Sequence, residues 1–299
     1  MIGGVSATIR RLGPGATLAA AILLALALAA AAAPLVELAL GLDAEAVDLF
    51  GRLAPPSAGH PLGTDELGRD LLLRLLYGGR VSLTVGVVAA VAASAIGTAI
   101  GLAAGYLGGR TDALLMRFAD GVIALPLLPL LIVLAAVDLT KLGLSPEAAA
   151  SEAVLLGRLV VLVTLVGWPT TARLVRAAAL SLRRREFVEA ARSLGYSPLR
   201  IAVRHVLPNA AAPILVATTL AVGNVVLFES VLSFLGLGIR PPTPSWGNML
   251  TGAQELIWES PRLAIWPGVL IFATVVSVNL LGDALRDALD PRSRRRGTG

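Results

Sequence analysis

The sequence lacks several residue types on which common protein chemistries depend. Its 299 residues include no cysteine, which excludes disulfides and thiol chemistry. Only two histidines are present, His60 and His205, so a metal site built from imidazole groups is not expected. The single lysine is Lys141, in the run Thr-Lys-Leu-Gly, and a phosphate-binding loop requires Gly-Lys-Ser/Thr. We therefore expect no catalytic residue, no bound metal and no ATP hydrolysis by this chain.

Charged side chains are also scarce. They make up 15% of the residues, whereas hydrophobic residues make up 56% and the mean hydropathy is +0.79. A soluble domain carries about 25% charged residues. Continuous apolar runs of about 20 residues cross a bilayer as helices, and a β-barrel would show alternation instead. The sequence therefore predicts an all-α polytopic membrane protein with six transmembrane helices, at about 16–40, 81–106, 118–138, 154–180, 210–237 and 263–282.

The arginines indicate how these helices are oriented. They gather before the first helix, between the second and third helices, in the connection at 181–209 and in the basic tail at 286–299. In a six-helix chain all of these segments lie on one side. Because positively charged loops are retained in the cytoplasm, we expect both termini and the 181–209 connection to be cytoplasmic. The net charge of +5 then reflects topology, and no nucleic-acid partner is expected.

The N-terminus allows a second interpretation. Arg10 and Arg11 precede an apolar run that ends in alanines before Pro34, a pattern that also occurs in secretory signals. Cleavage would leave five helices and place the mature N-terminus outside. The length of the run at 16–40 favours an uncleaved first helix.

Residues 41–80 are polar and rich in proline and glycine. Thr64 is a typical N-cap residue, and Asp65 and Glu66 would occupy the first turn, where the helix dipole favours acids. Leucines then recur at helical spacing from Leu67 to Leu76. This pattern predicts an amphipathic helix on the membrane surface, although packing on another extramembrane domain would fit it equally well. We assign residues 1–79 to an N-terminal region with the first transmembrane helix.

The second predicted helix carries Gly97, Gly101 and Gly105 at four-residue intervals. Such a row lets another helix backbone approach closely. The approaching helix could belong to the same chain, as an internal packing seam, or to a second subunit.

The connection at 186–209 has the most distinctive spacing. Glu186, Glu189 and Arg192 stand at i, i+3 and i+6, beside a face of alanine and apolar residues. Gly195 is placed to end this short helix, and Pro198 prevents its continuation. A short helix with small side chains and a sharp end suits insertion into a groove on a partner. A solvated basic loop would explain the arginines but not this order, so the candidate docking residues are Glu186, Glu189, Ala190, Ala191, Arg192, Leu194 and Gly195.

This pattern, Glu-Ala-Ala at 189–191, then Gly195 and Leu207-Pro208, resembles the EAA loop of ABC importer permeases. Further stretches are similar to the oligopeptide, dipeptide and nickel branch of those permeases, and to its C-type subunit in particular. They are His60–Asp70 followed by Arg80–Leu83, Leu232–Gly238 followed by Pro241–Met249, and Leu281–Pro291. The chain departs from the branch at 254–267, where Trp258 and Trp266 flank Glu259, and around Lys141–Glu152.

The resemblance implies an ABC importer type I permease fold at 80–285, with the coupling loop at 181–209. It implies a multi-pass location in a bacterial inner membrane, and no cofactor bound by this chain. The implied partners are a homologous B-type permease subunit, an extracytoplasmic substrate-binding protein and two cytoplasmic ATPase subunits that hold ATP and Mg. The implied cargo is a peptide, with nickel or another small solute as the alternative.

A polar path through the bilayer would need polar groups within the helices. Glu229 lies in the fifth predicted helix, with Asn224 and Ser230 beside it, and these three are the candidates for the translocation path. The alternative for Glu229 is a hydrogen bond between helices near the outer surface. A secondary transporter is the competing class, but one carboxylate in mid-helix and the lack of an inverted repeat in the sequence disfavour it.

Overall fold

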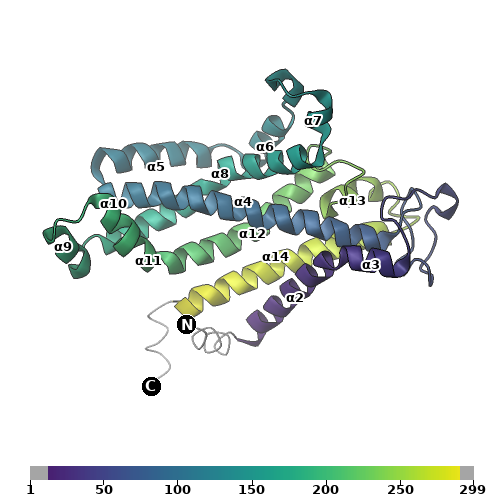
Figure 1. Ribbon diagram of the computed structural model, residues 1–299, viewed down its shortest axis with the longest axis horizontal. Helices are drawn as coiled ribbons and strands as arrows, with labels where there is room; N and C mark the ends of the chain where they lie inside the picture. The colour runs from purple at the N-terminus through teal and green to yellow at the C-terminus, as the bar shows by residue number, and fades with distance from the viewer. Residues whose placement is uncertain (1–12, 290–299) are drawn as a thin grey trace.

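The structure is a computed structural model that describes residues 13–289. The described part is an elongated bundle of long helices with short helices at its two ends (Figure 1). An isolated bridge between Thr64 and Asp70 is the only β-type pairing within residues 13–289. One end, called here the α9 end, carries α9 (Glu186–Ser193), α10 (Pro198–Ile201), η3 (Ala202–Val206) and α11 (Leu207–Asn209). The opposite end, called the α13 end, carries α3 (Ala33–Leu40), η1 (Leu49–Gly51) and α13 (Trp246–Ala253).

Five single helices are long and apolar enough to cross a membrane. They are α2 (Pro14–Ala31), α4 (Leu71–Leu107), α8 (Glu152–Leu182), α12 (Ala211–Phe234) and α14 (Arg262–Leu289). A sixth crossing is formed only if α5 (Gly109–Ala124) and α6 (Leu127–Ala135) are taken together. The first predicted helix is interrupted as well, because α2 ends at Ala31 and α3 starts at Ala33, next to Pro34.

The third predicted helix differs most from the expectation of a continuous run at 118–138. Its helical part begins already at Gly109 and is bent by 84° between α5 and α6. Leu125, the residue before Pro126, is extended with ψ 138°. A proline disfavours helical geometry in the residue before it and cannot donate a backbone hydrogen bond, so the helix breaks here. After α6 the chain forms η2 (Leu139–Leu142) and α7 (Pro146–Ala150) before entering α8.

The break at α6 leaves carbonyl groups at its C-terminal end without helical partners. Arg158, on α8, donates hydrogen bonds to these carbonyl groups. Its Nη2 donates to the carbonyl oxygens of Leu134, at 3.2 Å, Ala135, and Val137, at 2.8 Å. A cation at a helix C-terminus also suits the helix dipole. One side chain therefore fixes the end of the broken helix to its neighbour.

The amphipathic helix predicted from Thr64 is wrong in its start and its location. Helix α4 begins at Leu71, and its N-cap is Asp70, which accepts from the backbone N of Leu73 at 2.8 Å. The preceding residues form a turn because Gly68 has φ +75°, and a Cβ there would collide with the carbonyl oxygen of Asp48. Leu71 and Leu75 are buried against Trp246 and the start of α14. Leu71 and Leu75 of the leucine stripe therefore face the protein interior, whereas Leu67 is exposed.

The longest contact in the bundle lies between α4 and α8, and the glycine row forms it. A Cβ at Gly97 would lie 2.5 Å from the carbonyl oxygen of Trp168, and one at Gly105 would lie 2.6 Å from that of Arg176. At Gly101 it would collide with the carbonyl oxygen of Ala172. The internal packing seam is thus confirmed.

The tryptophans fall into two pairs. Trp168, on α8, and Trp246, at the start of α13, are buried. Trp258 and Trp266 are exposed, and they lie before and within the first turns of α14. Both exposed tryptophans belong to the stretch at 254–267, in which the sequence departs from the permeases that it resembles.

Candidate functional site

The short helix α9 projects from the bundle where α8 ends (Figure 1). Its first turn holds Glu186 and Glu189, where the positive end of the helix dipole favours carboxylates. Val188 and Ala191 are buried in a cluster with Val175 and Ala179 of α8. The helix is therefore held to the bundle by one narrow apolar face.

The remaining candidate docking residues face outward. Exposed side chains on this surface are Glu186, Phe187, Glu189, Ala190, Arg192 and Leu194. Ala191 is the exception, because it packs inward with Val188. The structure thus brings the predicted residues together on and beside one protruding helix and divides them into an exposed face and a buried anchor.

Gly195 ends α9 as its position suggests. Its φ is +76°, a left-handed conformation that glycine adopts without the steric cost of a side chain. The backbone N of Gly195 donates to the carbonyl of Arg192 at 3.0 Å, and that of Tyr196 donates to Ala191 at 3.2 Å. Ser197 then caps α10, accepting from the backbone N of Arg200 at 3.4 Å. The chain turns back toward the bundle within these few residues.

Sequence reasoning missed the aromatic support of this turn. The ring of Tyr196 stacks on that of His205 with centroids 6.0 Å apart. The guanidinium of Arg200 lies over the same Tyr196 ring at 4.3 Å from its centroid. His205 belongs to η3, a π-helical turn just before Pro208. A tyrosine directly after the helix-ending glycine was the available signal.

The three candidates for the translocation path lie in different surroundings. Asn224 is exposed and lines a cavity of about 670 Å³ between α8 and α12. Thr170 and Thr171 of α8 and Arg286 of α14 also line this cavity. Ser230 is buried, and its hydroxyl donates to the carbonyl of Val226 in its own helix at 2.8 Å. Of the three, Asn224 is the one that this conformation presents to an open space.

Glu229 is enclosed by the protein, with 0% of its surface exposed. Its Oε2 accepts from the hydroxyl of Ser82 on α4 at 2.8 Å, and its Oε1 accepts from the hydroxyl of Ser233 at 2.7 Å. The expected alternative, a hydrogen bond between helices, is therefore present. The sequence could not identify Ser82 as the partner, because 147 positions separate the two residues.

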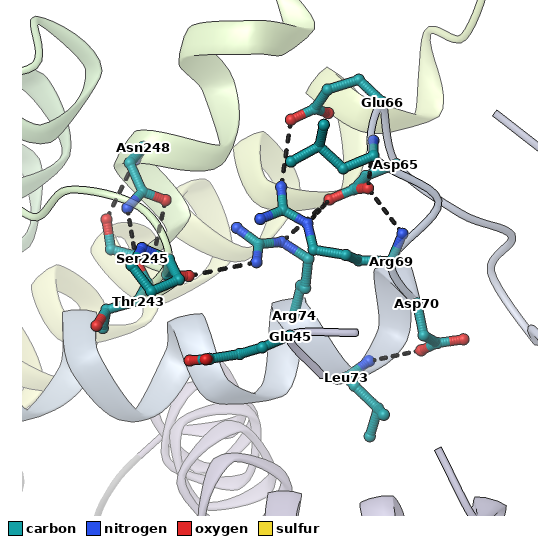
Figure 2. A network of polar contacts seen from close by, with 12 residues as sticks. Glu45, Asp65, Glu66, Arg69, Asp70, Leu73, Arg74, Thr243, Ser245 and Asn248 are labelled. Atoms are coloured by element: carbon teal, nitrogen blue, oxygen red, sulfur yellow. Dashed lines mark hydrogen bonds and ion pairs between the residues drawn. The ribbon is translucent and has the colours of Figure 1, made fainter. Parts of the chain in front are cut away.

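A second polar cluster lies at the same end of the bundle, and Figure 2 shows it around Asp65. The buried carboxylate of Asp65 pairs with Arg69 at 2.8 Å and with Arg74 at 3.2 Å. Arg74 also donates to the carbonyl of Pro242 at 3.4 Å. Nearby, Ser245 and Asn248 form a reciprocal capping box at the start of α13. Pairing with Asp65 offsets part of the cost of burying these two arginines.

The sequence matches a known protein family over most of its length. Residues 97–295 match a family described as binding-protein-dependent transport system inner membrane component. The chain is 38% identical over 243 residues to the dipeptide transport system permease protein DppC of Alkalihalophilus pseudofirmus, covering 81% of this chain and 75% of that protein. It is 42% identical over 237 residues to the glutathione transport system permease protein GsiD of Escherichia coli, covering 79% and 74%. A putative peptide transport system permease protein of Brucella abortus is 38% identical over 246 residues, covering 82% and 78%.

Proposed function

The chain belongs to the family of binding-protein-dependent transport system inner membrane components, and from this premise we propose that it is a permease subunit of an ATP-driven peptide importer. It forms half of the translocation path across a bacterial inner membrane. The observation that carries the proposal is the protruding helix α9 with its exposed docking face and its glycine end. The names of relatives that cover most of the chain support dipeptides or other short peptides as cargo.

In the proposed complex the chain pairs with a homologous B-type permease subunit. Two cytoplasmic ATPase subunits bind ATP and Mg, and an extracytoplasmic substrate-binding protein delivers the cargo. This chain binds no cofactor of its own. The arginine-rich connection at 181–209 lies at the α9 end of the bundle, so we place this end in the cytoplasm. The sequence pattern of arginines places both termini on the same side.

Coupling would pass through α9. ATP binds the closed form of the ATPase dimer more tightly and so shifts the complex toward it. The exposed face of α9, seated in a groove of the ATPase, is carried along with this closure. Because Val188 and Ala191 fix α9 to α8, the movement is transmitted to a helix that spans the membrane. Glu186, Glu189, Ala190, Arg192, Leu194 and Gly195 provide the contact, and Ala191 provides the anchor.

The cavity between α8 and α12 is the proposed cargo-facing surface. Asn224 carries both a donor and an acceptor, which suits the backbone amide groups of a peptide. Thr170 adds a hydroxyl to the same wall. Thr171 and Arg286 also line the cavity, but most of the remaining wall is apolar, with residues such as Phe228 and Leu220, so it would tolerate different side chains.

Uptake measurements test the proposal. A strain that lacks this chain should lose uptake of a radiolabelled dipeptide and regain it when the wild-type chain is supplied. Retained dipeptide uptake with lost nickel uptake would select the nickel importer instead. Unchanged uptake of both solutes, in the presence of the other subunits, would contradict the proposed function.

A matched pair of variants tests the docking role of α9. Ala190→Glu places a carboxylate in the proposed groove and should reduce uptake and ATPase co-purification by about tenfold or more, because an unpaired buried charge is costly. Ala148→Glu makes the same change on α7, at an exposed alanine away from α9, and should leave both unchanged. Equal effects of the two variants would refute docking through α9.

A further inference from the structure

The buried carboxylate of Glu229 sits at the centre of a hydrogen-bonded cluster that links three parts of the chain. Ser82 comes from α4, and Ser233 lies one turn further along α12. A carboxylate fully enclosed in an apolar helix bundle is costly unless its oxygen atoms are hydrogen-bonded. Both oxygens are satisfied here by serine hydroxyls. The serines, in turn, have further partners.

Each serine also forms a hydrogen bond with the connection between α12 and α13. Ser82 Oγ accepts from the backbone N of Trp246 at 3.2 Å. Ser233 Oγ accepts from the backbone N of Ile239 at 3.0 Å. A hydroxyl has one hydrogen and two lone pairs. With the hydrogen directed to Glu229, the lone pairs of each serine are free to accept from these two backbone N–H groups.

The segment held in this way, residues 237–246, is also attached to the helices at several other points. The backbone N groups of Leu237 and Gly238 both donate to the carbonyl oxygen of Leu232 on α12 at 2.9 Å. Trp246 donates through Nε1 to the carbonyl of Leu75 at 3.0 Å, and Arg74 donates to Pro242 at 3.4 Å. Asn248 donates to the carbonyl oxygen of Thr243 (Figure 2). It also donates to the carbonyl oxygen of Ile239, and both bonds tie the segment to the start of α13. Glu229 therefore contacts the segment through these two serines, from its position on α12.

We propose that Glu229 is a positioning residue, which orients Ser82 and Ser233 so that residues 237–246 and the start of α13 are fixed to α4 and α12. The connection at the α13 end then moves together with these two helices. This assignment differs from a direct contact with cargo, because Glu229 is 0% exposed and Asn224 of the same helix lines the cavity. It rests on the hydrogen-bond geometry and does not depend on the identity of the transported solute.

The chain has no cysteine, so a single introduced thiol can report on this segment. Ile239 is buried, and Ile239→Cys should react slowly with a thiol reagent in permeabilised membranes that contain the whole complex. Adding Glu229→Ala should raise the labelling rate by about tenfold or more, since losing buried hydrogen bonds shifts a local opening equilibrium by roughly this factor. Glu229→Gln, which retains one acceptor oxygen, should give an intermediate rate.

Two single-hydroxyl variants sharpen the test. Ser233→Ala removes the acceptor for the Ile239 N–H and should raise labelling at position 239 more than Ser82→Ala, whose backbone partner is Trp246. Thr274→Ala is the matched control, because its buried hydroxyl bonds only the carbonyl of Leu270 in its own helix among the contacts found within residues 13–289. This control should leave the labelling rate unchanged.

A second reporter separates positioning from general loss of stability. Val188→Cys, buried at the α9 end, should label at the same slow rate with and without Glu229→Ala. Equal acceleration at positions 188 and 239 would reduce Glu229 to a general stabilising residue and overturn the proposal. So would an unchanged rate at position 239. If Glu229→Ala does not accumulate in the membrane, Ser233→Ala decides the question by the same criterion.

Discussion

Gly195 combines a left-handed backbone with open surroundings. Its φ is +76°, and a Cβ built at this position meets nothing within 4 Å among the described residues. Backbone conformation, and not space, is therefore the requirement at this position. Asparagine tolerates the left-handed region far better than β-branched residues do.

This difference between asparagine and β-branched residues can be tested at position 195. Gly195→Val should reduce uptake several-fold, because holding a residue in the left-handed region costs about 1–2 kcal/mol and the end of α9 would shift. Gly195→Asn should keep most of the uptake. The measurement is uptake at matched membrane levels of the two variants, and wild-type uptake by Gly195→Val would contradict the requirement.

The sequence predicts the role of a residue when that role depends only on its spacing from neighbouring residues in the chain. The glycine end of α9 and the acidic residues of its first turn follow from local rules, and the structure agrees. The inward packing of Ala191 was not predictable, since it depends on the direction in which α9 leaves α8. The hydrogen-bond partner of Glu229 was not predictable either, because Ser82 lies on a helix that is distant in the sequence.

The seam between α4 and α8 shows how glycine sets the distance between two elements. Gly97, Gly101 and Gly105 of α4 lie against the backbone of α8, so a side chain at any of these positions would push the two helices apart. Gly121 of α5 offers the contrast, because a Cβ there meets nothing within 4 Å in the described part of the chain.

A matched pair of alanine substitutions tests whether α4 and α8 are in close contact. Gly101→Ala should lower the free energy of unfolding by about 1–3 kcal/mol, as overpacking does. Gly121→Ala should leave it unchanged or raise it by about 0.5–1 kcal/mol, because alanine restricts the unfolded chain more than glycine. The loss of helical circular dichroism on heating the detergent-solubilised chain measures both. A Gly101→Ala variant as stable as Gly121→Ala would show that the helices are not in close contact.

Element boundaries were predicted well for isolated apolar runs and poorly where a turn interrupts the pattern. The fifth helix, expected at 210–237, is α12 at Ala211–Phe234. Hydropathy alone is insensitive to a bend, so it does not predict the break at Leu125–Pro126, although the proline indicates one. The leucine stripe after Thr64 had the right period, but Gly68 and the cap at Asp70 delay the helix start.

At the scale of the whole molecule, the proposed orientation places the α9 end in the cytoplasm and the α13 end outside. Ser197 is exposed at the first end, and Glu255 is exposed at the second. Ser245 lies in the same connection as α13, but its exposure of 0% makes it unsuitable as a reporter.

Single cysteines test this orientation directly. Ser197→Cys should react with an impermeant thiol reagent only in inside-out vesicles, and Glu255→Cys only in intact spheroplasts, because the bilayer separates the two ends. Detergent should make both positions reactive, which controls for burial. Reaction of both cysteines from the same side would refute the proposed topology.

The division of the four tryptophans gives the protein two distinct populations of indole emission. Trp168 and Trp246 are shielded by protein, whereas Trp258 is 94% and Trp266 40% exposed. Indole rings favour the boundary between lipid and water, and Ile265, Val269 and Phe272 continue an exposed apolar surface along α14. In reconstituted vesicles, brominated lipids should therefore quench part of the emission, and the Trp258→Phe/Trp266→Phe double variant should abolish that part. If quenching persisted in the double variant, the buried pair would be accessible to lipid. The fluorescence of the unmodified chain thus reports how deeply the start of α14 sits in the bilayer.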